Sequence, residues 1–275
     1  IPATKQALEA AELEVADIDF MIFATSTPDF YAPGSGCLLQ DKMGFNEIGA
    51  LDIRVQCSGF LYGLSIAEQY IKTGVFKNIL LIGAEVQSSA MDLTDEGRDT
   101  AIIFGDGAGA AIISATDEER GILSTHMHSE GKYLKELWLE SPASNTGNPR
   151  ISYKDLDAGK QYLKMNGREV FRHAVKRFPE VIHECLEKNN LTVADINLLI
   201  PHQANLRITQ MVQKKLDLNE EQVYSNIHKY GNTTAGTIPI ALAEVVKEGK
   251  ISKGDIIIFA SFGSGFTWAS AAIKW

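Results

Sequence analysis

Cysteine is scarce in this sequence, and its few cysteines are not arranged for metal binding or cross-linking. The three cysteines, Cys37, Cys57 and Cys185, are widely spaced and form no Cys-x-x-Cys pair. Neither a thiolate metal site nor a disulfide framework is therefore indicated. We expect a protein of the reducing cytoplasm.

The sequence also lacks excess positive charge and long apolar runs. It has 26 basic against 35 acidic residues, a formal net charge of −9. This balance argues against a nucleic-acid binder, which needs a clustered basic surface to neutralise phosphates. No apolar run approaches the roughly 18 residues of a membrane span, and the first residues lack the pattern of a signal peptide. With 45% hydrophobic residues in 275, the chain can bury a sizeable core and is expected to bind no membrane.

Strand-like and helix-like segments alternate along the chain. Several of the strand-like segments are continuously apolar, which is typical of a sheet covered by helices on both faces. Residues 100–114 ("TAIIFGDGAGAAIIS") predict two strands that meet at a glycine turn. The other segments are helices at 1–13, 34–44, 58–74 and 167–190 and strands at 17–26, 50–56 and 78–85.

An internal repeat relates the start of the chain to a segment in its second half. The segment "ALEAAELEVADIDFMIFATS" aligns with "ECLEKNNLTVADINLLIPHQ", and both contain Val-Ala-Asp-Ile. A repeat of this kind predicts two similar βα halves, here 1–115 and 116–275. In this alignment Cys57 and Asn232 fall at matching places, on the loops that open the central helix of each half. The duplication is therefore expected to bring them face to face.

Cys57 is either a packing residue or a nucleophile. Free cysteine is among the most buried residue types. A cysteine at the start of a helix, however, has its pKa lowered by the unpaired N–H groups there. Gly59 and Gly63 would let another backbone approach the thiol closely. The polar neighbours Gln56 and Ser58 also favour the nucleophile.

His202 is the partner that a nucleophilic thiol would need. It lies where an apolar strand breaks at Pro201 and a helix begins, a common position for functional side chains. The other histidines are expected on the surface or in packing, with His126 and His128 in a loop. Together with Glu130 these two form only a weak metal-binding signal, so no metal site is predicted.

Five blocks of the sequence together resemble the beta-ketoacyl-[acyl-carrier-protein] synthase III family of the thiolase superfamily. They are "QCSGFLYGLSIAEQYI", "FGDGAGAA", "PHQANLRI", "YGNTTAGTIPIAL" and "FGSGFTWASAAIKW". The resemblance implies a thiolase-like α/β fold, in which two duplicated βα halves form a layered α-β-α-β-α sandwich, and a homodimer. It also implies that Cys57 is acylated and that His202 and Asn232 complete a catalytic triad.

The reaction implied by the resemblance is a decarboxylative condensation. An acyl-CoA primer acylates the cysteine and then joins malonyl-[acyl-carrier-protein] to give a 3-oxoacyl product, as in the initiation of fatty acid synthesis. The CoA thioester is a substrate and no cofactor is implied. His202 Nε2 and the Asn232 amide would donate to the enolate oxygen formed as CO2 leaves.

Other activities remain open for the same Cys-His-Asn site. A paralogue could transfer an acyl group from CoA to an alcohol or amine, or could condense substrates in a specialised pathway. A non-catalytic acyl-binding subunit and a cysteine hydrolase are further alternatives.

The resemblance also implies a set of substrate-binding residues. At Ala32 the family often has a phenylalanine that reaches across the dimer into the partner's acyl pocket, so alanine implies a primer longer than acetyl. Ser264 replaces a glycine, and its hydroxyl is expected to narrow the cavity. The full expected set is Ala32, Met165, Ala204, Asn205, Phe262, Gly263 and Ser264.

A basic helix face is expected to bind the acidic carrier protein. Arg207 and Lys214 are seven residues apart, hence on one side of a helix, and Lys215 is adjacent. An ordinary solvated face is the alternative for the lysines. Family members usually have further residues before the first one here, so we expect the natural protein to be longer.

Overall fold

The central strands are apolar on both faces, and this fixes where the helices lie. In β3 (Asn78–Glu85), Ile79 and Leu81 belong to one buried cluster, whereas Leu80 and Ile82 belong to another. Successive side chains of a strand point to opposite faces of the sheet. The sheet that contains β3 therefore has helices on both sides.

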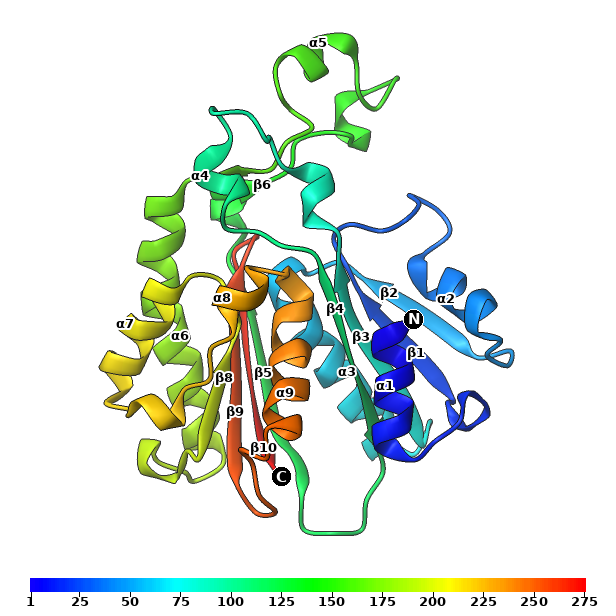
Figure 1. Cartoon of the computed structure of the whole chain (residues 1–275), viewed down its shortest axis with the longest axis vertical. Coiled ribbons are helices and arrows are strands. Elements are labelled where there is room, and N and C mark those ends of the chain that lie inside the picture. Colours follow the sequence, from blue (N-terminus) through cyan, green and yellow to red (C-terminus); the bar gives the residue numbers. More distant parts are fainter.

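The computed structural model describes all of residues 1–275 and contains two four-stranded sheets (Figure 1). In the first sheet strand 107–114 runs antiparallel to β3, and in the second sheet strand 267–274 runs antiparallel to strand 256–263. The first sheet has the order β2 (Gly49–Ile53), β1 (Phe20–Ala24), β3, β4 (Gly107–Ser114). The second has the order β5 (Gly121–Ser129), β10 (Thr267–Lys274), β9 (Ile256–Gly263), β8 (Leu198–Pro201).

Helices fill the space between the sheets and cover their outer faces (Figure 1). The outer pair on the first sheet is α1 (Pro2–Ala11) and α2 (Ser35–Met43). The middle layer is α3 (Gly59–Lys72) and α9 (Thr237–Lys247). The outer pair on the second sheet is α6 (Gly167–Lys188) and α7 (Leu206–Leu216). The α-β-α-β-α order confirms the predicted fold class.

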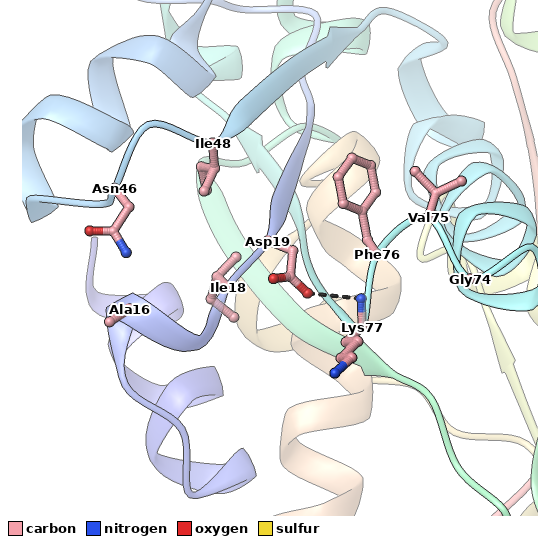
Figure 2. A pocket seen from close by; sticks show the side chains of 9 residues that line it. All are labelled: Ala16, Ile18, Asp19, Asn46, Ile48, Gly74, Val75, Phe76 and Lys77. Atoms are coloured by element: carbon pink, nitrogen blue, oxygen red, sulfur yellow. Dashed lines mark hydrogen bonds between the residues drawn. The ribbon is translucent and has the colours of Figure 1, made fainter.

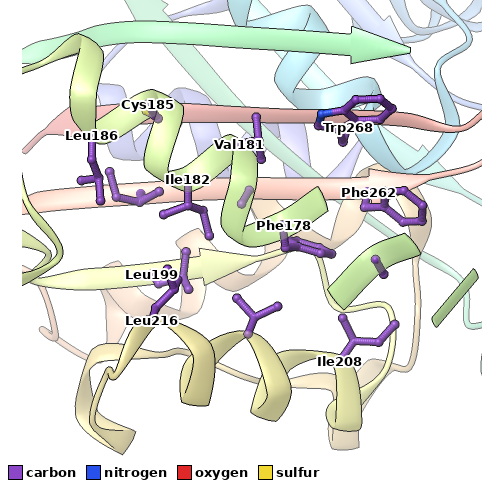
Figure 3. Packing of buried hydrophobic residues seen from close by; sticks show 14 of the residues in the cluster. Phe178, Val181, Ile182, Cys185, Leu186, Leu199, Ile208, Leu216, Phe262 and Trp268 are labelled. Atoms are coloured by element: carbon purple, nitrogen blue, oxygen red, sulfur yellow. The ribbon is translucent and has the colours of Figure 1, made fainter. Parts of the chain in front are cut away.

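The outer core of the second sheet is a cluster of 19 buried residues. Phe178, Val181 and Ile182 of α6 belong to it, and α7, which packs beside α6 on the same outer layer, contributes residues such as Ile208 (Figure 3). The apolar side chain of Phe262 at the end of β9 joins this cluster. Phe262 is also one of the expected substrate-binding residues, so the hydrophobic core extends to the expected substrate site.

Short elements and 3-10 turns connect these layers. The short helices and strands are α4 (Arg98–Ala101), β6 (Leu137–Trp138), α5 (Tyr153–Asp157), β7 (Lys164–Met165) and α8 (Ile227–Tyr230). Helix α5 and its flanking loops extend away from the sheets, at the top of Figure 1. None of the helices combines the length and apolar character that crossing a membrane requires.

The internal repeat of the sequence is visible in the backbone. The two Val-Ala-Asp segments both form 3-10 turns, η1 (Val15–Asp17) and η6 (Val193–Asp195), closed by capping boxes. After each turn a side chain, Asp19 or Asn197, accepts a hydrogen bond from the first N–H of β3 or β9. The position expected to divide the halves, 115/116, lies in the turn between β4 and β5. One buried cluster contains residues from both sheets, so the halves share a core.

Two local predictions were wrong. Residues 100–114 do not form two strands: their first residues end α4, a loop follows, and only Gly107–Ser114 is a strand. The glycines lie where β4 passes closely under α9, and a Cβ at Gly109 would lie 2.6 Å from the backbone nitrogen of Ile240. His126 and His128 lie in strand β5 and not in a loop, and both approach Glu184 on α6.

Glu244 on α9 anchors the segment that leads to Asn232. Its carboxylate accepts hydrogen bonds from Tyr224, Asn226, Lys229 and Tyr230. Burial alone would raise the pKa of Glu244, but these hydrogen bonds outweigh it and lower the pKa to about 2. A carboxyl whose pKa is lower in the folded than in the unfolded state stabilises the fold above the unfolded pKa.

We expect Glu244→Gln to lower the free energy of unfolding at pH 7 by about 1.5–3 kcal/mol, because hydrogen bonds to a charged group are lost. The difference from wild type should shrink as the pH falls from the unfolded pKa of 4.5 toward about 2, where the wild-type carboxylate is itself protonated. Denaturant unfolding across this pH range measures it. The exposed Glu221→Gln is the control, and an equal effect of both variants would contradict the prediction.

Candidate active site

Cys57 lies in the turn that joins β2 to the middle-layer helix α3. The turn is the 3-10 segment η2 (Gln56–Ser58), and Gln56 has a left-handed backbone with a φ of 44°. This conformation lets the chain reverse from the strand into the helix within a few residues. Cys57 itself is buried, with 5% of its surface exposed.

The second half has an equivalent turn, η8 (Thr234–Gly236), at the start of α9. Thr234 has a φ of 51° and matches Gln56. The residue that matches Cys57 is therefore Ala235, three positions after Asn232. The sequence alignment paired Cys57 with Asn232 and was wrong by this offset, although the two turns do contact each other.

Gly263 gives the thiol its space. A Cβ at Gly263 would lie 2.4 Å from Cys57 Cβ and 2.5 Å from its Sγ. Gly63 was expected to serve this purpose, but a Cβ there would meet Leu81 Cδ1 at 2.5 Å. Gly63 therefore allows α3 to pack on the sheet, and the close approach to the thiol comes from the other half.

The thiol is neutral in the free protein. Burial raises the pKa of Cys57 to about 12, and the Glu85 carboxylate adds to the rise. The backbone N–H groups of Ser264 and of Cys57 itself face the sulfur and act in the opposite direction. The expectation that the helix start lowers this pKa was wrong, because loss of hydration at the buried sulfur outweighs the two N–H donors.

His202 follows β8 and is almost fully buried, with 1% of its surface exposed. Its Nδ1 lies 2.6 Å from the hydroxyl of Thr237. Its Nε2 is buried and has no hydrogen-bond partner in the protein. Burial lowers the pKa of His202 to about 3, so the imidazole is neutral near pH 7.

Asn232 is held between the two halves and is 4% exposed. Its backbone N–H donates to the Ile103 carbonyl, and its own carbonyl accepts from Gly105. The side-chain Oδ1 accepts a hydrogen bond of 2.9 Å from the N–H of Thr234. Because an N–H can donate only to the amide oxygen, this contact shows which end of the amide is the oxygen and which is the nitrogen. The Nδ2 donor is left for a ligand.

A single cavity of about 90 Å³ has Cys57, His202 and Asn232 in its wall. Five of the expected substrate-binding residues also line it: Met165, Ala204, Asn205, Phe262 and Gly263. The wall combines one thiol, one imidazole and one carboxamide with apolar side chains. Such a cavity can take up an acyl group and carry out chemistry on it.

The expected site residues did not include seven further residues of the wall. Most are apolar and come from the loop after α4, from β6 and from the start of α6, segments that the tertiary structure brings to the thiol. They are Ile103, Phe104, Leu137, Gly167, Val170, Phe171 and Ile208. Phe104 is the first residue of the "FGDGAGAA" block and Ile208 is the last residue of the "PHQANLRI" block, so these two blocks were the signals in the sequence that could have identified them.

Ser264 and Ala32 lie outside this wall. The Ser264 hydroxyl donates to the carbonyl oxygen of Leu137, so it does not narrow the cavity as expected. It instead connects the β9–β10 turn to β6. Ala32 is exposed in the loop before α2, and its expected role concerns the cavity of a second copy of the chain.

The expected docking residues lie on the outer helix α7. Arg207 and Lys214 are exposed, and neither forms an ion pair within the chain. Lys215 is exposed too, but its Nζ donates to the Val175 carbonyl on α6. Lys215 therefore joins two helices of the outer layer, whereas the other two basic side chains are available to a partner.

A second, open depression lies at the other end of the first sheet (Figure 2). It measures about 440 Å³, and residues such as Asp19, Phe76 and Lys77 line it. Asp19 accepts a hydrogen bond from the Lys77 backbone N–H at 2.8 Å. None of the expected site residues lines this depression.

Comparisons with known proteins agree with this geometry. A family model described as 3-Oxoacyl-[acyl-carrier-protein (ACP)] synthase III matches residues 51–131, and one described as its C terminal matches residues 186–275. A beta-ketoacyl-[acyl-carrier-protein] synthase III of Clostridioides difficile is 45% identical over 99% of this chain and 81% of its own length. The chain belongs to the beta-ketoacyl-[acyl-carrier-protein] synthase III family.

Solved structures support the same family. The 3-oxoacyl-[acyl-carrier-protein] synthase III of Aquifex aeolicus is 41% identical, with a TM-score of 0.89 over 99% of this chain and 83% of that one. A priming beta-ketosynthase of the R1128 polyketide pathway is 30% identical, with a TM-score of 0.90 over 98% of this chain and 79% of that one. This synthase III chain is thus a condensing acyltransferase with the thiolase fold.

In this synthase, Gly263→Ala is expected to displace the thiol. The added methyl would overlap Cys57, so we expect a loss of about 1–3 kcal/mol in stability and about 100-fold slower transfer of an acyl group to the cysteine. Gly131→Ala is the control, because nothing lies within 4 Å of a Cβ there. Thermal unfolding and acylation rates measure both variants. Equal behaviour of the two would contradict the prediction.

Proposed function

We propose that this chain joins an acyl-CoA primer to malonyl-[acyl-carrier-protein] with loss of CO2, and so makes the first 3-oxoacyl intermediate of fatty acid synthesis. The observation that carries the proposal is the shared cavity of Cys57, His202 and Asn232. Relatives at 42–45% identity over nearly the whole chain bear the name of this synthase. We further propose a homodimer in the cytoplasm that needs no cofactor besides its CoA substrate.

In the first half-reaction the Cys57 sulfur attacks the thioester carbon of the primer. A new carbon–sulfur bond forms, the bond to the CoA sulfur breaks, and the proton lost by the Cys57 thiol ends on that sulfur, so CoA leaves as a thiol. The N–H groups of Cys57 and Ser264 near the sulfur are suited to hold the negative oxygen of the intermediate. Burial of the thiol keeps water away, which protects the acyl-enzyme from hydrolysis.

In the second half-reaction malonyl thioester loses CO2, and the released electron pair forms an enolate. The Asn232 amide is held by the contact of its oxygen with the Thr234 N–H. We therefore assign its Nδ2 group as the donor to the enolate oxygen. A donor of this kind typically contributes about 100-fold or more in rate. The enolate carbon then attacks the acyl carbon, and Cys57 leaves as a thiolate that takes a proton from solvent.

The apolar part of the cavity wall would hold the primer's chain. Leu137, Met165, Val170 and Phe171 surround a volume of about 90 Å³, which is room for several water molecules and hence for a short acyl group. A primer longer than acetyl would need additional space. The alanine at position 32 of a second copy, in place of a bulky ring, is the proposed source of that space.

The α7 surface is proposed to bind the carrier protein. Arg207 and Lys214 offer positive charge on a protein of net charge −9, and Leu206 and Met211 beside them are 47% and 38% exposed. A local basic face with apolar contacts suits an acidic partner. Lys215, which bonds within the chain, is proposed to contribute less.

Incubation with acyl-CoA thioesters of increasing chain length tests the acyl-enzyme step. We expect mass spectrometry to find one acyl group per chain on Cys57, with a longer primer such as octanoyl retained at least as fast as acetyl. Cys57→Ser should retain none. Adding malonyl-[acyl-carrier-protein] should release CO2 and remove the acyl group. A clear preference for acetyl would contradict the assignment of primer length, and absence of CO2 would favour a different acyltransferase.

Charge reversal at Arg207 tests the docking surface. Arg207→Glu should raise the KM for malonyl-[acyl-carrier-protein] roughly tenfold, with a weaker salt dependence, because a charge at the rim of an interface acts on association. Transfer from acyl-CoA to Cys57 should be unchanged. Lys42→Glu on the outer helix α2 is the matched control. Equal loss in both half-reactions would refute the docking role.

A further inference from the structure

We propose that Gln87 is a positioning residue for Asn232: it holds the left-handed backbone of Thr234, which aims a backbone N–H at the Asn232 amide oxygen. The proposal rests on the proposed function, in which the Asn232 Nδ2 group donates to the enolate oxygen. It adds to that function a residue of the first half, outside the cavity wall, on which the orientation of this donor depends.

The side chain of Gln87 reaches from the first half to the η8 turn of the second. Gln87 begins a 3-10 segment just after β3, and its Nε2 donates a hydrogen bond of 2.8 Å to the Thr234 hydroxyl. The same nitrogen lies 3.3 Å from an oxygen of the Glu85 carboxylate, an acceptor, so the NH2 end of the amide is the one on this side. Gln87 and Thr234 are 4% and 3% exposed, and water therefore does not replace the bond.

Thr234 needs this support because its backbone is left-handed. Its φ of 51° lies in a region that is unfavourable for a residue branched at Cβ. Such a conformation persists only where the surrounding structure holds it. The Gln87 contact holds the Thr234 side chain, and the N–H of the next residue, Ala235, faces the Glu85 carboxylate. The segment at the end of β3 thus restrains two successive residues of the turn.

The φ angle of Thr234 determines where its N–H points relative to helix α9, which begins at Thr237. In the observed conformation this N–H donates to Asn232 Oδ1 at 2.9 Å. If Thr234 returned to the right-handed region, the N–H would rotate about the N–Cα bond, and Oδ1 would lose its donor. Because Oδ1 and Nδ2 belong to one planar amide, the Nδ2 group would lose its direction as well.

Loss of the Gln87 contact should affect one half-reaction and spare the other. The enolate of the second half-reaction needs the Asn232 donor in place, since a donor stabilises developing charge only when it is already aimed at it. Acylation relies on the N–H groups that face the Cys57 sulfur, those of Cys57 and Ser264. None of the hydrogen bonds of Gln87 reaches these residues. Release of CO2 is therefore the step that should depend on Gln87.

Gln87→Met tests the role, because it keeps the length of the side chain and removes the donor. We expect release of CO2 from malonyl-[acyl-carrier-protein], followed with a radiolabelled malonyl carboxylate, to fall roughly 10- to 100-fold, as for a misplaced catalytic group. Acylation of Cys57, followed by rapid quenching and mass spectrometry, should be unchanged. Thr234→Val removes the other partner of the same hydrogen bond and should slow CO2 release similarly. The two changes together should slow it no further, because they break one interaction.

Thr234→Gly distinguishes positioning from a general loosening of the fold. Glycine adopts a positive φ without a steric penalty, and it keeps the backbone N–H that bonds to Asn232. Added to Gln87→Met, it should therefore restore most of the lost rate of CO2 release. Gln222→Met is the matched control. The Gln222 Nε2 likewise donates a hydrogen bond, to the Ile196 carbonyl, but the residue is not in the cavity wall, so CO2 release should be unchanged.

An unchanged rate of CO2 release in folded Gln87→Met would overturn the proposal. Equal losses in the two half-reactions, or no recovery with Thr234→Gly, would overturn it too. If Gln87→Met does not fold, Thr234→Val and Thr234→Gly in the wild-type background decide, because only the valine variant should be slow and equal rates would contradict the proposal. A wild type that releases no CO2, or releases it no faster than Asn232→Ala, would refute the proposed function instead.

Discussion

The contact between the two helix-opening turns in the middle layer is the constraint on which the site depends. Each turn lies against a glycine: Gly263 against Cys57, and Gly83 against Ala235, where a Cβ would lie 2.2 Å from a carbonyl oxygen. Side chains at either glycine would force the turns apart. The duplicated halves thus meet through two close approaches at glycines, and only one of the two turns carries a thiol.

Burial at this contact decides the charge state of the site. Loss of hydration raises the pKa of Cys57 and lowers that of His202, so the free protein holds a thiol and a neutral imidazole and not an ion pair. Reactivity must then come from proton transfer during attack and from fixed donors, not from a preformed thiolate. The same exclusion of water favours survival of a thioester that awaits a second substrate.

Side-chain contacts with the backbone set the orientation of the polar groups. The N–H of Thr234 orients the amide of Asn232, and the hydroxyl of Thr237 lies 2.6 Å from Nδ1 of His202. Glu244 supports the approach to this turn through several hydrogen bonds from the segment before it. The polar groups of the second half are therefore oriented by the η8 turn, whose backbone is left-handed at Thr234, and by the first residue of α9.

The sequence by itself determined the fold class, most elements and the three polar residues of the site. Apolar periodicity predicted β3 and α6 with nearly the observed bounds. The place of Cys57 at a helix start and of His202 at a strand end marked these two residues, because such ends depend on neighbouring residues, and Asn232 was added by the resemblance to the family. Only the tertiary structure decided which glycine lies against the thiol, where the Ser264 hydroxyl points, and that burial raises the pKa of Cys57. These properties depend on segments far apart in the chain, whose approach no local pattern of residues records.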